Sequence, residues 1–120
     1  MCSSDLVTDL FATLGARGAP VLAISPPCYG GVLFTRGGNV PPERLDSGRV
    51  MAVRTAWVRA AKERGFTLYN LDRTLCPSGR SDDSISGDGA HYSNDGANKV
   101  APIVANAIRE AAIRVSATGG

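Results

Sequence analysis

The order of the segments predicts an α/β protein built around a parallel sheet. Apolar side chains recur at helical spacing in residues 6–14, 50–61 and 93–115. Between them, residues 21–25 and 67–71 form short apolar runs with turn-forming residues nearby. Alternating helices and strands of this kind pack as a three-layer α/β/α sandwich, and a strand–helix–strand unit in one sheet implies parallel pairing.

Two strands are too few for a buried parallel sheet. We therefore expect the chain to be part of a larger sheet, or to complete its sheet by association. Residues 1–115 are expected to belong to a single domain, and residues 116–120 to form a disordered tail.

The opening helix and the first strand have clear boundaries in the sequence. Ser3 or Ser4 can cap the helix, and Gly15 or Gly18 can end it. Five apolar residues recur on one side of this helix: Leu6, Val7, Leu10, Phe11 and Leu14. The strand that follows is continuously apolar, as in a sheet buried on both faces, and ends at Pro26.

The second helix and the second strand complete the unit. Gly65 is expected to end the helix, and residues 67–71 form the strand. The helix is amphipathic, with an inner face of Val50, Val53, Trp57, Ala60 and Ala61. Residues 28–45 and 72–87 are too polar or irregular for helix or strand, and loops of this length are usually functional or disordered.

The final helix is expected to begin with Ser93 or Asn94 as its N-cap. Proline inside a helix costs about 3 kcal/mol, so Pro102 predicts either a bend or a regular helix that begins late. The predicted inward side consists of Val100, Ile103, Val104, Ala107 and Ile108.

Composition excludes several classes of protein. The chain has 120 residues and a formal net charge of +2, with its cations scattered, so a nucleic-acid partner is not expected. No apolar run approaches the length that spans a bilayer, and the first residues lack the pattern of a signal peptide.

Asp88 and His91 are the candidate catalytic residues. In open α/β sheets, ligands bind outside the carboxyl ends of the strands, and the loop after the second strand leads to both residues. A neutral imidazole can take a proton from a hydroxyl nucleophile, and a carboxylate three residues earlier can orient its ring. The spacing alone is a weak motif, because a single histidine is more often structural or solvated.

Two other interpretations of this region have less support. Asp88 and His91, with Asp82 or Asp83, could ligate a divalent ion, but the chain has no second histidine or cysteine pair at ligand spacing, so no metal or other cofactor is predicted. Ser25 ends the first strand, but nothing in the sequence marks it as activated, and a polar strand terminus is the better interpretation.

The three cysteines leave two alternatives open. If the strands are parallel neighbours, Cys28 and Cys76 both follow the carboxyl edge of the sheet, where a disulfide is geometrically possible. Such a bridge would imply an oxidising compartment. The alternative is a pair of buried free thiols in a cytosolic protein.

Three blocks follow one another along the chain: residues 21–30, residues 71–79, and residues 88–97 with Val100-Ala101-Pro102. Together they resemble the C-terminal half of an SGNH hydrolase (GDSL-like esterase) domain. The likeness is strongest to SGNH domains fused to bacterial membrane acyltransferases of the acyltransferase-3 type. The resemblance implies a flavodoxin-like fold, an extracytoplasmic location, and ester hydrolysis or O-acyl (acetyl) transfer on acylated saccharides or glycans of the cell envelope.

The resemblance also implies roles for single residues. His91 matches the general base, Asp88 the acid that orients it, and Cys28 and Cys76 match two cysteines that pair. Three blocks of the family have no match here: the one with the nucleophilic serine and the two with the glycine and asparagine oxyanion donors. We therefore expect a fragment whose Met1 falls inside the domain and which is inactive when isolated. The alternative is a non-catalytic module that binds a glycan or a partner through residues 28–45.

Overall fold

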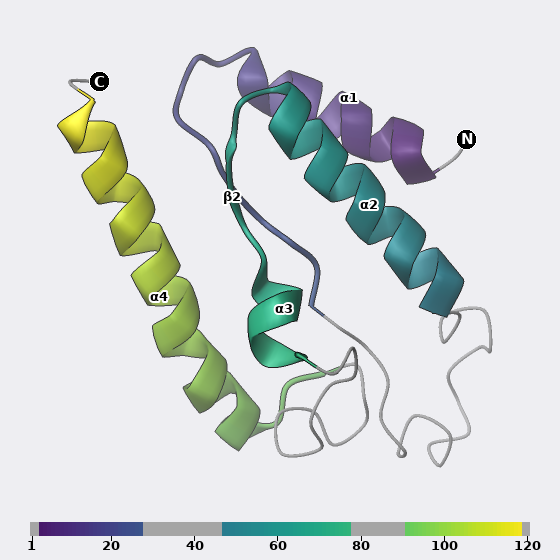
Figure 1. Cartoon of the computed structure of the whole chain (residues 1–120), viewed down its shortest axis with the longest axis vertical. Coiled ribbons are helices and arrows are strands. Elements are labelled where there is room, and N and C mark those ends of the chain that lie inside the picture. Colours follow the sequence, from purple (N-terminus) through teal and green to yellow (C-terminus); the bar gives the residue numbers. More distant parts are fainter. Residues whose placement is uncertain (1–2, 28–46, 78–90, 119–120) are drawn as a thin grey trace.

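The computed structural model describes residues 3–27, 47–77 and 91–118 (Figure 1). These residues form a mixed α/β structure that is mainly helical and contains a two-stranded parallel sheet. In chain order the elements are α1 (Ser3–Gly15), β1 (Leu22–Ile24), α2 (Ser47–Glu63), β2 (Thr67–Tyr69), α3 (Leu71–Leu75) and α4 (Asn94–Ala117). None of these helices is both long and apolar enough to cross a membrane.

The parallel pairing of the two strands confirms the sequence prediction. Leu22 lies opposite Thr67, Ala23 opposite Leu68, and Ile24 opposite Tyr69. One further hydrogen bond extends the ladder at each end: Thr67 N–H donates to the carbonyl of Val21 over 3.1 Å, and Ser25 N–H donates to the carbonyl of Tyr69 over 2.9 Å. The strands are shorter than predicted, because prolines flank β1 and α3 begins soon after β2.

One hydrophobic cluster joins α1 and α2 to the sheet. Phe11 is 2% exposed and packs edge-on against Trp57, with 4.8 Å between the ring centroids. Small side chains on α2 let the two helices approach closely. The buried members are Val7, Phe11, Ala23, Ala56, Ala60 and Ala61, with Trp57, Phe66 and Leu68 packed against them.

A second cluster joins α3 and α4 to the strands. Its buried members are Leu71, Leu75, Cys76 and Val100, with Ile24, Tyr69, Ile103 and Val104 packed around them. Neighbouring residues of β1 therefore enter different clusters: Ala23 contacts α1 and α2, whereas Ile24 contacts the α3 and α4 side. Val100, Ile103, Val104 and Ala107 lie on the inward side of α4, as predicted.

Gly65 ends α2 as the sequence predicts. Its φ of 66° lies in the left-handed region that glycine adopts without steric cost. The next residue, Phe66, turns back so that its N–H donates to the carbonyl of Ala61 over 2.9 Å. This hydrogen bond satisfies one of the last carbonyls of the helix and directs the chain into β2.

Three expectations about the elements are wrong, and one alternative is excluded. The segment predicted as a loop after β2 contains α3, because Leu71 and Leu75 bury their side chains in the second cluster. Of the two alternatives for Pro102, the late start is excluded, since α4 begins at Asn94 and contains Pro102. Ile108 is 53% exposed rather than inward-facing. Ser116 and Ala117, the first two residues of the predicted tail, belong to α4.

The apolar side of α1 is also only partly buried. Val7 and Phe11 belong to the core, but the three leucines predicted beside them remain exposed: Leu6 (57%), Leu10 (46%) and Leu14 (39%). Helical periodicity identifies an apolar side, whereas the neighbouring elements decide how much of it is covered.

We expect Phe11→Ala to lower the free energy of unfolding by about 3–5 kcal/mol, because it removes a buried ring and leaves a cavity between α1, Trp57 and Phe66. The exposed neighbour Leu10 provides the control, since Leu10→Ala should change stability by only about 0.5 kcal/mol. Urea unfolding followed by circular dichroism measures both. Equal losses in the two variants would contradict this account of the core.

Candidate functional site

Four polar side chains form a cluster where the two strands end. The strand-end cluster consists of Ser25, Arg54, Asn70 and Asp72. Ser25 Oγ donates a hydrogen bond to Asp72 Oδ1 over 2.7 Å and accepts one from the Asp72 backbone N–H over 3.3 Å. Arg54 forms an ion pair with Asp72 through its Nε and donates from Nη2 to Asn70 Oδ1 over 3.1 Å.

The topology brings these residues together. Ser25 follows β1, Asn70 follows β2, and parallel strands end at the same edge of a sheet. Asp72 lies in the first turn of α3, and Arg54 reaches it from α2, which crosses from β1 to β2. The Arg54 and Asp72 side chains are each 15% exposed, so their ion pair is largely shielded from water.

Asp72 is held in its charged form. Burial, the strongest single influence, raises its pKa, but the hydrogen bonds from Arg54 and Ser25 and the charge of Arg54 together outweigh burial. The net result is a pKa below the ordinary 3.8. The carboxylate therefore stays ionised at neutral pH and accepts hydrogen bonds from both neighbours.

The strand-end cluster has the properties of a structural cluster rather than of a catalytic centre. Ser25 is only 1% exposed, and its hydroxyl donates a hydrogen bond to the Asp72 carboxylate. Because the pKa of Asp72 is lowered, this carboxylate is a weak base. The structure thus agrees with Ser25 as a polar strand terminus rather than a nucleophile. Sequence reasoning missed Arg54, Asn70 and Asp72, although Asp72, directly after the apolar run of residues 67–71, was a usable signal.

His91 lies in an exposed position just before α4. Ser93 caps the helix, as predicted, with its Oγ accepting a hydrogen bond from Gly96 N–H over 2.9 Å. Val100, one turn further along α4, packs with Leu75 and Cys76 in the second cluster. Figure 1 shows that this end of α4 lies at the same end of the molecule as α3, which directly follows β2.

Several candidate residues lie outside the described residues. They are Cys28, Asp82, Asp83 and Asp88, together with the whole loop of residues 28–45. Orientation of His91 by Asp88 therefore stays a prediction. Cys76 is 5% exposed within the second cluster, and its pairing with Cys28 also stays a prediction. Within residues 3–27, 47–77 and 91–118, no group of three His, Cys, Asp or Glu side chains is placed to hold a metal ion.

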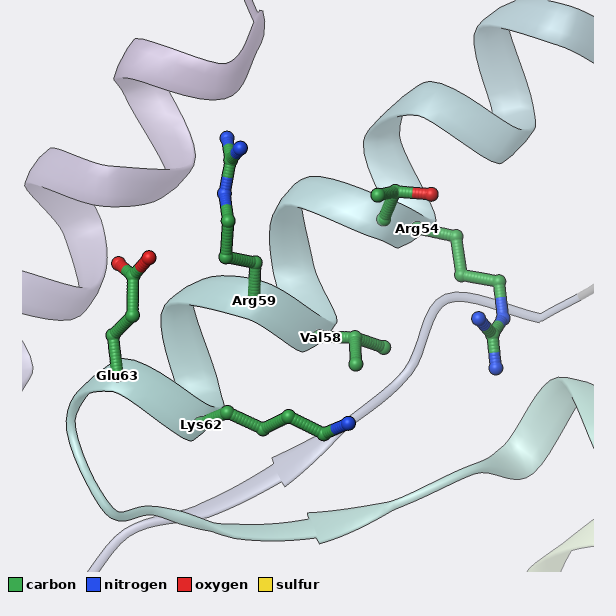
Figure 2. Close-up of a pocket in the computed structure, with 6 residues that line it drawn as sticks. Arg54, Val58, Arg59, Lys62 and Glu63 are labelled. Carbon is green, nitrogen blue, oxygen red and sulfur yellow. The ribbon is translucent and has the colours of Figure 1, made fainter.

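A shallow groove of about 300 Å³ runs along the outer face of α2. It is lined by Arg54, Thr55, Val58, Arg59, Lys62 and Glu63. Figure 2 shows Arg59 and Glu63 extending on the side where α1 lies, whereas Arg54, Val58 and Lys62 extend on the side of the strands. The charged groups diverge, so they do not surround one position where an anion could bind.

Comparison of the chain with protein-family models, with curated proteins and with solved structures finds no match.

We expect Asp72→Asn to lower the free energy of unfolding at pH 7 by about 2 kcal/mol, because Arg54 loses its charged partner. The pKa of Asp72 is lower in the folded chain than in the unfolded one, so its contribution is complete above about pH 4 and is lost as pH falls through the folded-state value. The difference between wild type and variant should shrink over that range.

The matched control is Asp9→Asn, at an exposed position of α1. Urea unfolding at pH 7, 5, 4 and 3 measures all three proteins. A stability difference between wild type and Asp72→Asn that stays constant down to pH 3 would contradict the assignment.

We expect one free thiol per chain after export to an oxidising compartment, if Cys28 pairs with Cys76 and Cys2 stays reduced. The measurement is a thiol titration of the denatured, unreduced protein, and the same sample after reduction should give three. Three thiols before reduction would exclude the bridge.

Proposed function

We propose that the chain is the C-terminal half of an SGNH-type ester hydrolase or O-acyl transfer domain. In this proposal the two strands belong to the parallel sheet of a three-layer α/β/α sandwich, with α1 and α2 on one face and α4 on the other. The entry of Ala23 and Ile24 into different clusters supports helices on both faces. The substrate class is an acylated saccharide of the cell envelope, and the location is extracytoplasmic.

The position of His91 carries this proposal. The only histidine of the chain is exposed and lies beside the capped start of α4. Val100 anchors that end of α4 to Leu75 and Cys76, just beyond the carboxyl end of β2. This is the edge of a parallel sheet at which ligands bind. An exposed imidazole there is accessible to a substrate.

The proposed chemistry divides between this chain and residues outside it. His91 takes the proton of a serine hydroxyl while the serine oxygen bonds to the acyl carbon, and then returns the proton to the departing sugar oxygen. Asp88 accepts a hydrogen bond from the second ring nitrogen and fixes the tautomer. The 120 residues contain no Gly-Asp-Ser or Gly-x-Ser-x-Gly segment. The serine and the oxyanion donors are therefore supplied by sequence outside these residues.

We expect the isolated chain not to hydrolyse 4-nitrophenyl acetate above the rate of free imidazole. Addition of the N-terminal half of an SGNH domain, with its Gly-Asp-Ser strand, should produce turnover. His91→Ala should then lower kcat about 10²–10⁴-fold, because the general base is lost. Asp88→Ala should also lower kcat. The control is Asn98→Ala, at an exposed position of α4, which should leave kcat unchanged.

Two results would contradict the proposal. Hydrolysis by the isolated chain that disappears in His91→Ala would place the nucleophile within these residues. Glycan binding by the isolated chain, unaffected by substitution of Asp88 or His91 and without turnover after addition of the other half, would favour the non-catalytic module.

A further inference from the structure

The exposed leucines of α1 form one apolar stripe. Leu6, Leu10 and Leu14 are four residues apart, so they lie along one side of the helix. This side is adjacent to the buried residues Val7 and Phe11, so the leucine stripe continues the core outward. Large apolar side chains grouped in this way on a helix mark a surface that another segment covers.

The outer edge of β1 offers a second, independent feature. Hydrogen bonds to β2 use backbone groups of Val21 and Ser25, and the alternation of a parallel strand places Ala23 in the same set. The N–H and C=O groups of Leu22 and Ile24 therefore point to the opposite edge. In the described part of the chain, β2 is the one strand paired with β1.

The composition of the strands shows which edge a further strand would extend. Residues 21–24 are all apolar, and Ala23 is 4% exposed, as in an inner strand of a parallel sheet. In contrast, β2 includes Thr67 and Tyr69, and none of its residues is fully buried. This pattern is typical of an edge strand, so extension is favoured at β1.

The leucine stripe and this edge are suited to the same occupant. Packed helices lie about 8–10 Å apart, roughly twice the spacing between strands. α2 packs on β2 and beside α1, whereas Ala23 of β1 is buried in the same cluster as Val7 and Phe11 of α1. In the view of Figure 2, α2 lies between α1 and the two strands.

We propose that the outer edge of β1 and the leucine stripe of α1 together bind an apolar β-strand that runs parallel to β1 and belongs to the nucleophile-bearing segment. The identity of this partner rests on the proposed function. Its strand pairs with the backbone groups of Leu22 and Ile24, and its side chains on one face pack under the leucines. The nucleophile-bearing segment is thereby joined to the sheet at the side away from β2.

A second copy of the chain fits this surface less well. The helix α1 contains Asp5 and Asp9 and no Lys or Arg. Two copies of α1 packed against each other would bring these carboxylates together, and like charges in an interface oppose binding. A two-fold axis would also pair β1 with its copy in the antiparallel direction.

The experiment mixes the full chain with the N-terminal half of an SGNH domain. We expect a one-to-one complex by light scattering, and slower hydrogen exchange at the Leu22 and Ile24 amides than in the isolated chain. The Ala23 and Ser25 amides, which face β2, serve as the internal reference. Leu10→Lys should weaken the complex at least about tenfold. Ile113→Lys, at a 60% exposed position of α4, is the matched control and should leave the affinity unchanged.

Several results would overturn the proposal. One is the absence of a complex, and another is equal affinity of the Leu10→Lys and Ile113→Lys variants for the N-terminal half. The third is slow hydrogen exchange at the Leu22 and Ile24 amides in the isolated monomer, because it would show that the chain's own residues cover the edge. A dimer of the chain with the same protection would assign the surface to a second copy. A complex that forms with the expected protection but hydrolyses no ester would support this proposal and remove only the proposed function.

Discussion

The ion pair between Asp72 and Arg54 is the interaction on which the carboxyl edge of the sheet depends. Asp72 accepts hydrogen bonds from Arg54 on α2 and from Ser25 after β1, and it lies in the first turn of α3. One carboxylate therefore connects the ends of both strands to the helix that crosses between them. Because its charge is largely shielded from water, separating these partners would leave a poorly solvated charge.

The position of His91 follows from this edge through the second cluster. Leu71 and Leu75 hold α3 against the strands, and Val100 packs on the same residues from α4. The Ser93 cap then fixes where α4 begins, three residues after His91. The candidate base is thus held by a chain of contacts that begins at the strand ends, although the imidazole itself is exposed.

The two proposals start from two separate features of this chain. The sequence has a candidate base and its carboxylate without a recognisable nucleophile block. The structure has an apolar β1 with one neighbour in the described residues, and leucines on α1 that its core leaves exposed. The proposed segment carries both a serine and an apolar strand, and for this reason the two proposals are linked.

The sequence by itself determined the features that depend on neighbouring residues: α1, α2, α4 and the two strands, the end of α2 at Gly65, and a cap of α4 at Ser93 or Asn94. These follow from periodicity, backbone freedom and hydrogen bonds within a few residues. Tertiary structure alone decided that Leu71 and Leu75 fold as α3, that Leu10 and Ile108 stay exposed, and that Arg54 meets Asp72. Arg54 and Asp72 are 18 residues apart, and Ser25 and Asp72 are 47 apart. Their contacts exist only because parallel pairing brings the strand ends together, and no local pattern encodes that proximity.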